Sequence, residues 1–162
     1  MLKLGHPADK IGKDDNFRGL AIYNNVLYYT KGSGGNGVNT VYFLDTTGKA
    51  CPNGVGLPAS GAQLPTTPLS YDPATLQTDG LPSNMCILKG FNTELAKTST
   101  TSFPFGLFFA NPDTLYVADE GNGTNTFANG EYTAAAAQTF AGLQKWSSTG
   151  ASGSSHTRCR RA

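Results

Sequence analysis

The sequence predicts an all-β fold. Of its 162 residues, 20 are Gly, 19 are Thr and 12 are Asn, and only 14% are charged. This composition favours strands and turns over helices, because Thr suits strands whereas Gly and Asn suit turns. Short aromatic and β-branched runs separated by polar stretches indicate the same class. The length predicts one domain of ordinary size.

The charge and the hydropathy pattern exclude two classes of partner. The formal net charge is +1, which provides no field for holding nucleic acid or an anionic membrane. No apolar stretch approaches the roughly 20 residues of a transmembrane helix. We therefore expect no nucleic-acid partner and no membrane span.

The N-terminal segment 1–15 is expected to be irregular. Lys3, His6 and Pro7 interrupt the apolar stretch that a signal peptide would need. We therefore expect no export signal in this chain.

The middle of the chain predicts short strands separated by turns. Asn24-Asn25 and Asn111-Pro112-Asp113 have tight-turn chemistry and predict two hairpins. The runs 41–44 and 107–109 are continuously apolar, so we expect both faces of these strands to be covered. The alanine-rich stretch 133–140 is short and is expected to be a loop. The predicted strands are 19–23, 26–30, 40–45, 85–89, 105–110, 114–119 and 141–146.

Two segments repeat one design, a strand with Gly-Leu, a turn, and a strand with Leu-Tyr. The offset is 87 residues at the glycines and 88 at the second leucines, because the second turn is one residue longer. Such a repeat predicts two equivalent supersecondary units, as two consecutive antiparallel sheets stacked face to face. The matching dipeptides are Gly19-Leu20 with Gly106-Leu107, and Leu27-Tyr28 with Leu115-Tyr116.

The second unit resembles a known repeat. Residues 115–122 read L-Y-V-A-D-E-G-N, after Phe-Gly-Leu at 105–107 and before Gly-Leu-Gln-Lys-Trp at 142–146. This is similar to an NHL-type β-propeller repeat, most closely over 103–122. The first unit matches weakly, since Thr30-Lys31 stand where Ala-Asp is expected. Residues 16–146 also resemble secreted bacterial β-propeller-like proteins, a group with no assigned activity.

The resemblance implies a β-propeller fragment of two blades with up to four strands each; the alternative is an unrelated β-sandwich. The first blade would span 16–102, with a Pro-rich insertion at 46–84, and a second, incomplete blade would span 103–146. Closed propellers contain about four to eight blades, so we expect this chain to be a fragment or to assemble. We expect open blade faces to self-associate, with Leu107, Phe109 and Tyr116 as candidates for exposure.

The tail 147–162 has no aliphatic residue larger than Ala and contains three arginines, so it cannot form a core. The tail can be back-translated into DNA with suitable synonymous codons. When the first two bases of that DNA are skipped, it encodes F-Y-G-S-V-W-Q-F-A-Y-T-L-Q-A-G. That string contains an alternating aromatic strand, which would supply the fourth strand of the second blade. The tail is therefore expected to be either frameshifted or disordered.

Two cysteines bracket the Pro-rich insertion. A bridge between Cys51 and Cys86 would close this loop and contribute about 4 kcal/mol in the chain-entropy model. It would imply an oxidising compartment, extracellular or periplasmic in the intact parent protein. The alternative is two buried thiols in a cytosolic domain. Cys159 is expected to be unpaired.

Catalytic patterns are almost absent from the sequence. The only histidines are His6 and His156, both in the atypical ends, and no nucleophile elbow, zinc-protease motif or phosphate loop occurs. The glycine-rich stretch 32–37 precedes a strand where a nucleotide site needs a helix, so it predicts a hairpin loop. We predict no catalytic and no cofactor-binding residues.

One polar loop is a candidate calcium site. Calcium favours loops rich in oxygen ligands, and glycines beside them let the backbone wrap the ion. The alternative is an ordinary turn capped by Asp119, since the EF-hand spacing is missing. The candidate ligands are Asp119, Glu120, Asn122 and Asn125.

Two functional classes follow from these observations. The first is an extracellular β-propeller that serves as a binding or scaffold module for a protein or glycan. The alternative is a propeller enzyme, a lyase or hydrolase, whose catalytic residues lie in blades outside this chain.

Overall fold

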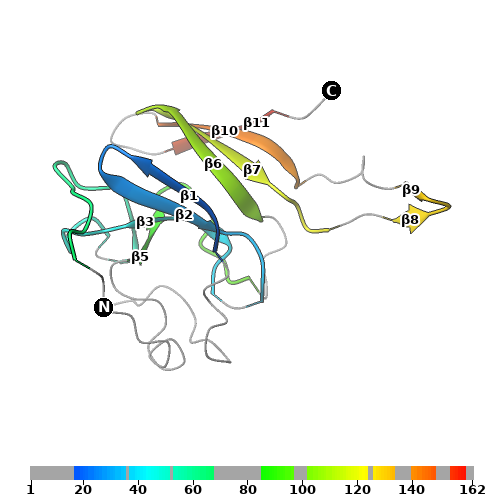
Figure 1. Ribbon diagram of the computed structural model, residues 1–162, viewed down its shortest axis with the longest axis horizontal. Helices are drawn as coiled ribbons and strands as arrows, with labels where there is room; N and C mark the ends of the chain where they lie inside the picture. Colours follow the sequence, from blue (N-terminus) through cyan, green and yellow to red (C-terminus); the bar gives the residue numbers. More distant parts are fainter. Residues whose placement is uncertain are drawn as a thin grey trace.

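The computed structural model describes residues 17–35, 37–51, 53–67, 85–96, 102–123, 126–133, 140–148 and 154–159, the last range by its backbone alone. Over these residues the chain forms two larger sheets and a small hairpin, with no helix (Figure 1). The all-β prediction is therefore confirmed, whereas segment 1–15 lies outside the described residues. Within this part of the chain, no helix is long and apolar enough to cross a membrane.

Sheet 1 contains the four strands predicted for the first unit and one more. The added strand, β4, lies within the Pro-rich insertion and pairs in parallel with its neighbour, whereas the other pairs are antiparallel. In order across the sheet, the strands are β1 (Phe17–Tyr23), β2 (Val26–Lys31), β3 (Thr40–Leu44), β5 (Met85–Leu88) and β4 (Val55–Gly56).

Sheet 2 is antiparallel, with β6 (Pro104–Asn111), β7 (Thr114–Asp119), β10 (Gly142–Ser148) and β11 (Ser154–Cys159) in that order. Its fourth strand, β11, lies in the tail 147–162, where the sequence predicts no strand. It pairs with β10 along its whole length. Such pairing uses main-chain groups and needs no apolar side chain, so the composition of the tail does not reveal it.

A short hairpin follows β7 and was not predicted. It consists of β8 (Phe127–Ala128) and β9 (Glu131–Tyr132), and it projects away from both sheets (Figure 1). The alanine-rich stretch expected to be a loop lies mostly outside the described residues.

The β1–β2 and β6–β7 hairpins have the same register, as the repeat predicts. Adding 87 to the residue on the first strand and 88 to its partner on the second converts the pairs of the first hairpin into pairs of the second. The exception is the pair beside the turn, because Tyr23↔Val26 corresponds to Asn111↔Thr114 after a register shift. Leu20 and Leu107 therefore occupy equivalent strand positions. The corresponding pairs are Leu20↔Tyr29 with Leu107↔Val117, and Ile22↔Leu27 with Phe109↔Leu115.

The two sheets stack face to face where β1 and β2 meet β6 (Figure 1). Gly19 touches the opposite backbone, since a Cβ there would lie 2.3 Å from the carbonyl oxygen of Phe105. The Thr30 hydroxyl accepts a hydrogen bond from the Gly19 N–H at 2.8 Å and donates one to the Phe105 carbonyl at 2.7 Å. The ring of Phe109 packs on Tyr23 and Tyr28, with centroids 4.7 and 4.4 Å apart. The predicted stacking is therefore observed.

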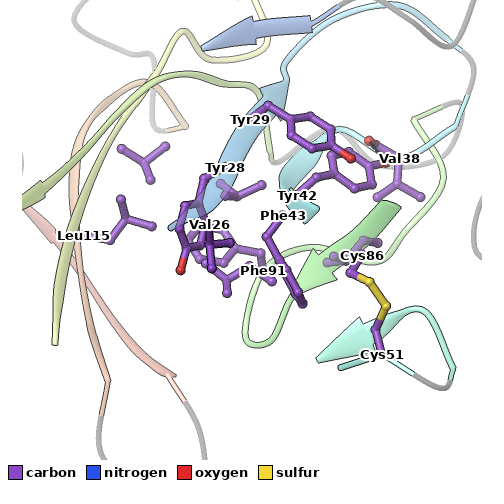
Figure 2. Packing of buried hydrophobic residues seen from close by; sticks show 14 residues of the cluster. Val26, Tyr28, Tyr29, Val38, Tyr42, Phe43, Cys51, Cys86, Phe91 and Leu115 are labelled. Atoms are coloured by element: carbon purple, nitrogen blue, oxygen red, sulfur yellow. Dashed lines mark hydrogen bonds between the residues drawn. A yellow bond between two sulfur atoms is a disulfide. The ribbon is translucent and has the colours of Figure 1, made fainter. Parts of the chain in front are cut away.

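The core is built mainly by sheet 1. Val41, Tyr42 and Phe43 are fully buried, and Figure 2 shows Tyr42 and Phe43 in this packing. The run 41–44 is therefore covered on both faces as predicted, with Leu44 at its end partly buried. In sheet 2 only alternate residues of β7, Leu115 and Val117, belong to the buried cluster among the described residues.

The prediction that the run 107–109 is covered on both faces is wrong. Phe108 is 66% exposed, because nothing in the described chain packs on the outer face of sheet 2. Leu107 and Phe109, expected to be exposed, are instead half-buried against the core. Tyr116 lies on the outer face and is half-buried.

Replacing Gly19 with Ala tests the close approach of the sheets. The added Cβ must push the Phe105 carbonyl away, so we expect the free energy of unfolding to fall by about 1–3 kcal/mol. Gly106→Ala is the matched control, because within the described part of the chain a Cβ at this equivalent position meets only the Ala118 Cβ, at an ordinary contact distance of 3.7 Å. Urea denaturation of dilute protein measures both, and equal losses would contradict the stacking.

Candidate functional site

A groove lies where one end of sheet 1 meets the same end of sheet 2. It encloses a cavity of about 130 Å³. Its walls are mostly aromatic and aliphatic, and a few polar groups lie on its rim, which is the usual make-up of a ligand site. The lining residues are Tyr28, Leu57, Pro58, Leu88, Phe91, Phe109, Pro112, Asp113, Thr114, Leu115, Trp146, Ser147 and Ser148.

The aromatic walls of the groove are held in place by contacts between the sheets. Phe91 stacks on Trp146 with ring centroids 3.8 Å apart. The indole N–H of Trp146 donates a hydrogen bond to the Gln144 side-chain oxygen at 3.0 Å, which fixes the ring orientation. Burial, with a smaller contribution from Tyr23, raises the pKa of Tyr28 to about 12. The Tyr28 phenol is protonated at neutral pH, as at its ordinary pKa of 10.0, and the raised pKa keeps it protonated in alkaline solution as well.

The polar rim is formed by the β6–β7 turn and the end of β10. The Asp113 N–H is bonded to the Asn111 side chain at 3.0 Å, and the Asp113 carbonyl accepts from the Ser148 N–H at 3.0 Å. These bonds occupy main-chain groups of Asp113, and the residue is exposed. Asp113 is therefore an exposed acidic residue of the groove lining, whose polar members also include Thr114 and Ser147.

The predicted calcium loop begins at the buried Asp119. One carboxylate oxygen of Asp119 accepts hydrogen bonds from the Phe103 N–H at 3.0 Å and the Gln144 amide at 3.1 Å. The other accepts from the Gly121 N–H at 2.9 Å. These bonds are those of a capped turn that also ties β7 to β10.

The structure describes two of the remaining candidate calcium ligands. Glu120 and Asn122 are exposed, and Asn125 lies outside the described residues. Calcium binding stays a prediction. Glu120 and Asn122 help line a separate polar hollow of about 350 Å³ between the glycine-rich loops of the two units.

Lys31 occupies the position in sheet 1 that Asp119 occupies in sheet 2. It is 1% exposed, and its ammonium group donates to the Ser33 carbonyl at 3.0 Å and the Asn39 side chain at 2.9 Å. A buried Lys was not predicted, because its sequence neighbours give no sign of burial. The repeat register was the available signal, since it aligns Lys31 with the capping residue of the second unit.

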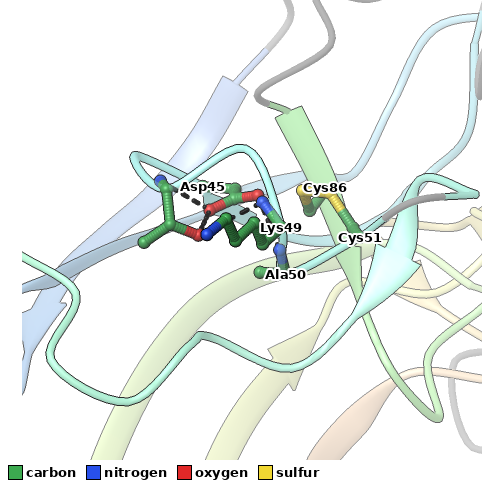
Figure 3. The surroundings of a disulfide bond; sticks show 6 residues. Asp45, Lys49, Ala50, Cys51 and Cys86 are labelled. Carbon is green, nitrogen blue, oxygen red and sulfur yellow. Dashed lines mark hydrogen bonds between the residues drawn. A yellow bond between two sulfur atoms is a disulfide. The ribbon is translucent and has the colours of Figure 1, made fainter.

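Cys51 and Cys86 form a disulfide in the structure, as predicted (Figure 3). Their Cα atoms are 5.9 Å apart, within the usual range for a bridge. The bond joins the start of the Pro-rich insertion to β5, where Cys86 is fully buried. The side chain of Cys159 lies outside the described part of the chain.

Asp45 lies beside the disulfide and organises the loop after β3. Its carboxylate accepts hydrogen bonds from the Thr47 N–H and hydroxyl at 2.8 and 2.7 Å, and from the Ala50 N–H at 2.9 Å (Figure 3). Burial acts to raise the pKa of Asp45, but these bonds and one from the Gly48 backbone outweigh it and hold the pKa below its ordinary value.

Asp45 and the two cysteines have potential ligand atoms within 4.8 Å of one another. In the oxidised protein this cluster is not a metal site, because the two sulfurs are bonded to each other and the carboxylate is bonded to its own loop. The hydrogen bonds of Asp45 hold the loop after β3 in a conformation that places Cys51 beside Cys86.

No match to the chain was found among protein-family models, curated proteins or solved structures. The resemblance to the NHL repeat therefore stays a prediction. The groove was not predicted from the sequence, and both histidines lie outside the residues whose side chains are described.

Removing the disulfide should destabilise the chain. We expect Cys51→Ser with Cys86→Ser to lower the free energy of unfolding by about 2–4 kcal/mol, because the unfolded chain regains the entropy of an open loop. Denaturant unfolding with and without reductant measures the effect, and Cys159→Ser is the control. Thiol titration of the denatured, unreduced protein should find one free thiol, and three would contradict the bridge.

Asp45 should contribute stability that acid removes. Its pKa is lower in the folded chain than in the unfolded chain, so the unfolded chain binds more protons as the pH falls. The contribution is present above the ordinary Asp pKa of 3.8 and is lost as the pH falls through the lowered folded value. At pH 7 Asp45→Asn should cost about 1 kcal/mol. Unfolding curves across pH should show this difference shrinking in acid; a constant difference would contradict the assignment.

Proposed function

We propose that the chain is a non-catalytic, extracellular β-propeller-type module that binds a glycan or protein ligand in the groove between its two sheets. The aromatic groove is the observation that carries this proposal. The repeated hairpin register and the stacked sheets support the comparison with propeller blades. The disulfide is compatible with an extracellular location.

The chemistry of the groove favours a glycan. The partly exposed rings of Trp146 and Phe109 offer rigid, flat apolar surfaces for the C–H faces of a sugar ring. The Asp113 carboxylate and the hydroxyl groups of Thr114 and Ser147 can bond to sugar hydroxyls at the rim. A cavity of about 130 Å³ has room for one small group, which indicates a single sugar unit or one side chain of a protein partner.

Trp146 reports binding directly, because it is the only tryptophan in the chain. We expect titration with at least one member of a panel of neutral oligosaccharides to change its fluorescence in a saturable way. Asp113→Asn should weaken that binding about tenfold, since a charged acceptor is lost from the rim. Glu94→Gln, an exposed acidic residue outside the groove, is the matched control.

Two outcomes would count against the glycan proposal. One is a panel in which no oligosaccharide changes the Trp146 fluorescence. The other is binding that Asp113→Asn and Glu94→Gln weaken equally. In the first case, a protein partner whose binding changes the same fluorescence would keep the groove as the site and replace the ligand class.

A further inference from the structure

Each sheet has an outer face that carries exposed apolar residues. On sheet 2, Phe108 is 66% and Leu143 50% exposed, and they share the face with Tyr116 and Ala118 by register. On sheet 1 the exposed part of the corresponding face is β1, where Leu20 is 67% and Ile22 60% exposed, whereas Tyr29 and Tyr42 on the same face are buried. Large exposed apolar residues grouped on one face mark an interaction surface.

The repeat identifies what each outer face matches. Leu20 and Ile22 are equivalent to Leu107 and Phe109, which sheet 2 packs against sheet 1. The outer face of sheet 1 therefore carries, on β1, the equivalents of the side chains with which sheet 2 packs on sheet 1. We call this surface the inserting face.

The outer face of sheet 2 carries part of the other side of this contact, the receiving face, which sheet 1 forms around Gly19 and Thr30. Gly106 is equivalent to Gly19, whose missing Cβ admits the Phe105 carbonyl, and Ala118 is equivalent to Thr30. Among the described residues, only the Ala118 Cβ comes within 4 Å of a Cβ placed at Gly106, at 3.7 Å.

We propose that a second copy of this chain covers the outer face of sheet 2. Sheet 1 of the second copy packs on this face in the same way that sheet 2 packs on sheet 1 within one chain. The occupant is a second copy because the chain carries parts of both sides of one contact, on opposite outer faces. Such a contact is head to tail, with different surfaces on the two partners. The proposal rests on the repeat and is independent of the ligand in the groove.

The contact between the sheets within one chain also predicts which atoms meet between the two copies. Arg18 is the equivalent of Phe105, so the Arg18 carbonyl of the second copy lies against Gly106 of the first.

The receiving face departs from its counterpart on sheet 1 at four positions: Phe108 stands at the position of Ala21, Ala110 at that of Tyr23, Glu120 at that of Gly32 and Lys145 at that of Phe43. Within one chain Gly32 lies against the Pro104 carbonyl, so the contact between copies must open at Glu120, and the equivalence is closest around Gly106. Lys145 is on β10, whereas the internal contact is concentrated on β1, β2 and β6. If the contact closes into a ring of about four to eight sheets, the ring contains about two to four copies.

Light scattering on the full, disulfide-bonded chain during size-exclusion chromatography measures the assembly across protein concentrations. We expect a discrete oligomer for the wild type. Gly106→Ala should weaken association at least about tenfold without changing the fold, because its Cβ would occupy the place of the incoming carbonyl. Ala118→Thr should strengthen association, since its hydroxyl can bridge the copies as Thr30 bridges the sheets.

A mixing experiment tests the direction of the contact. Phe108→Asp damages only the receiving face and Leu20→Asp only the inserting face, so each variant alone should be monomeric. Their mixture should form a one-to-one dimer, because one intact face of each kind remains. Phe127→Asp is the control, since Phe127 is 63% exposed on the projecting hairpin and belongs to neither face.

Three results would overturn the proposal. They are a monomeric wild type at high concentration, variants that stay monomeric when mixed, and Phe127→Asp as damaging as Phe108→Asp. Circular dichroism of each variant separates lost association from lost folding. Loss of glycan binding with intact assembly would overturn the proposed function alone, whereas loss of assembly with intact Trp146 titration would overturn this inference alone.

Discussion

The close approach of β6 to the backbone of sheet 1 determines how the two sheets fit together. Two glycines admit it: a Cβ on Gly19 would lie 2.3 Å from the Phe105 carbonyl, and one on Gly32 would lie 2.2 Å from the Pro104 carbonyl. Thr30 lies beside them, and its hydroxyl is hydrogen-bonded to the Gly19 N–H of sheet 1 and to the Phe105 carbonyl of sheet 2. The stacking of Phe109 on Tyr23, and the groove formed beyond it, depend on this spacing.

Local patterns predicted most of the strands, because hairpins place their signals close together in the sequence. The Asn24-Asn25 turn shows this directly: both residues have positive φ angles, 47° and 60°, which Asn tolerates and the hairpin twist requires. The Gly-Leu and Leu-Tyr pattern likewise predicted a register that both hairpins share. The disulfide was predicted because its cysteines bracket a loop that has no core of its own.

Features that depend on distant parts of the chain could not be predicted in this way. The groove joins Pro58, Phe91 and Trp146, which lie far apart in the sequence and converge only after the sheets stack. Gly32 belongs to a loop that composition alone describes as flexible, yet it is buried against β6. The continuous apolar run at 107–109 indicated two covered faces, but periodicity cannot tell whether a covering layer is present, and Phe108 is exposed.

The two sheets contribute unequally to stability, and this links the disulfide to the groove. Strand β3, buried except at its last residue, lies in sheet 1, whereas sheet 2 adds only Leu115 and Val117 to the buried cluster of the described chain. Sheet 2 therefore depends on sheet 1 for its packing. Asp45 and the Cys51–Cys86 bond secure the insertion that carries Leu57 and Pro58 to the groove wall. Since Phe91 follows β5 by a short turn and stacks on Trp146, loosening β5 would move one groove wall without breaking either hairpin.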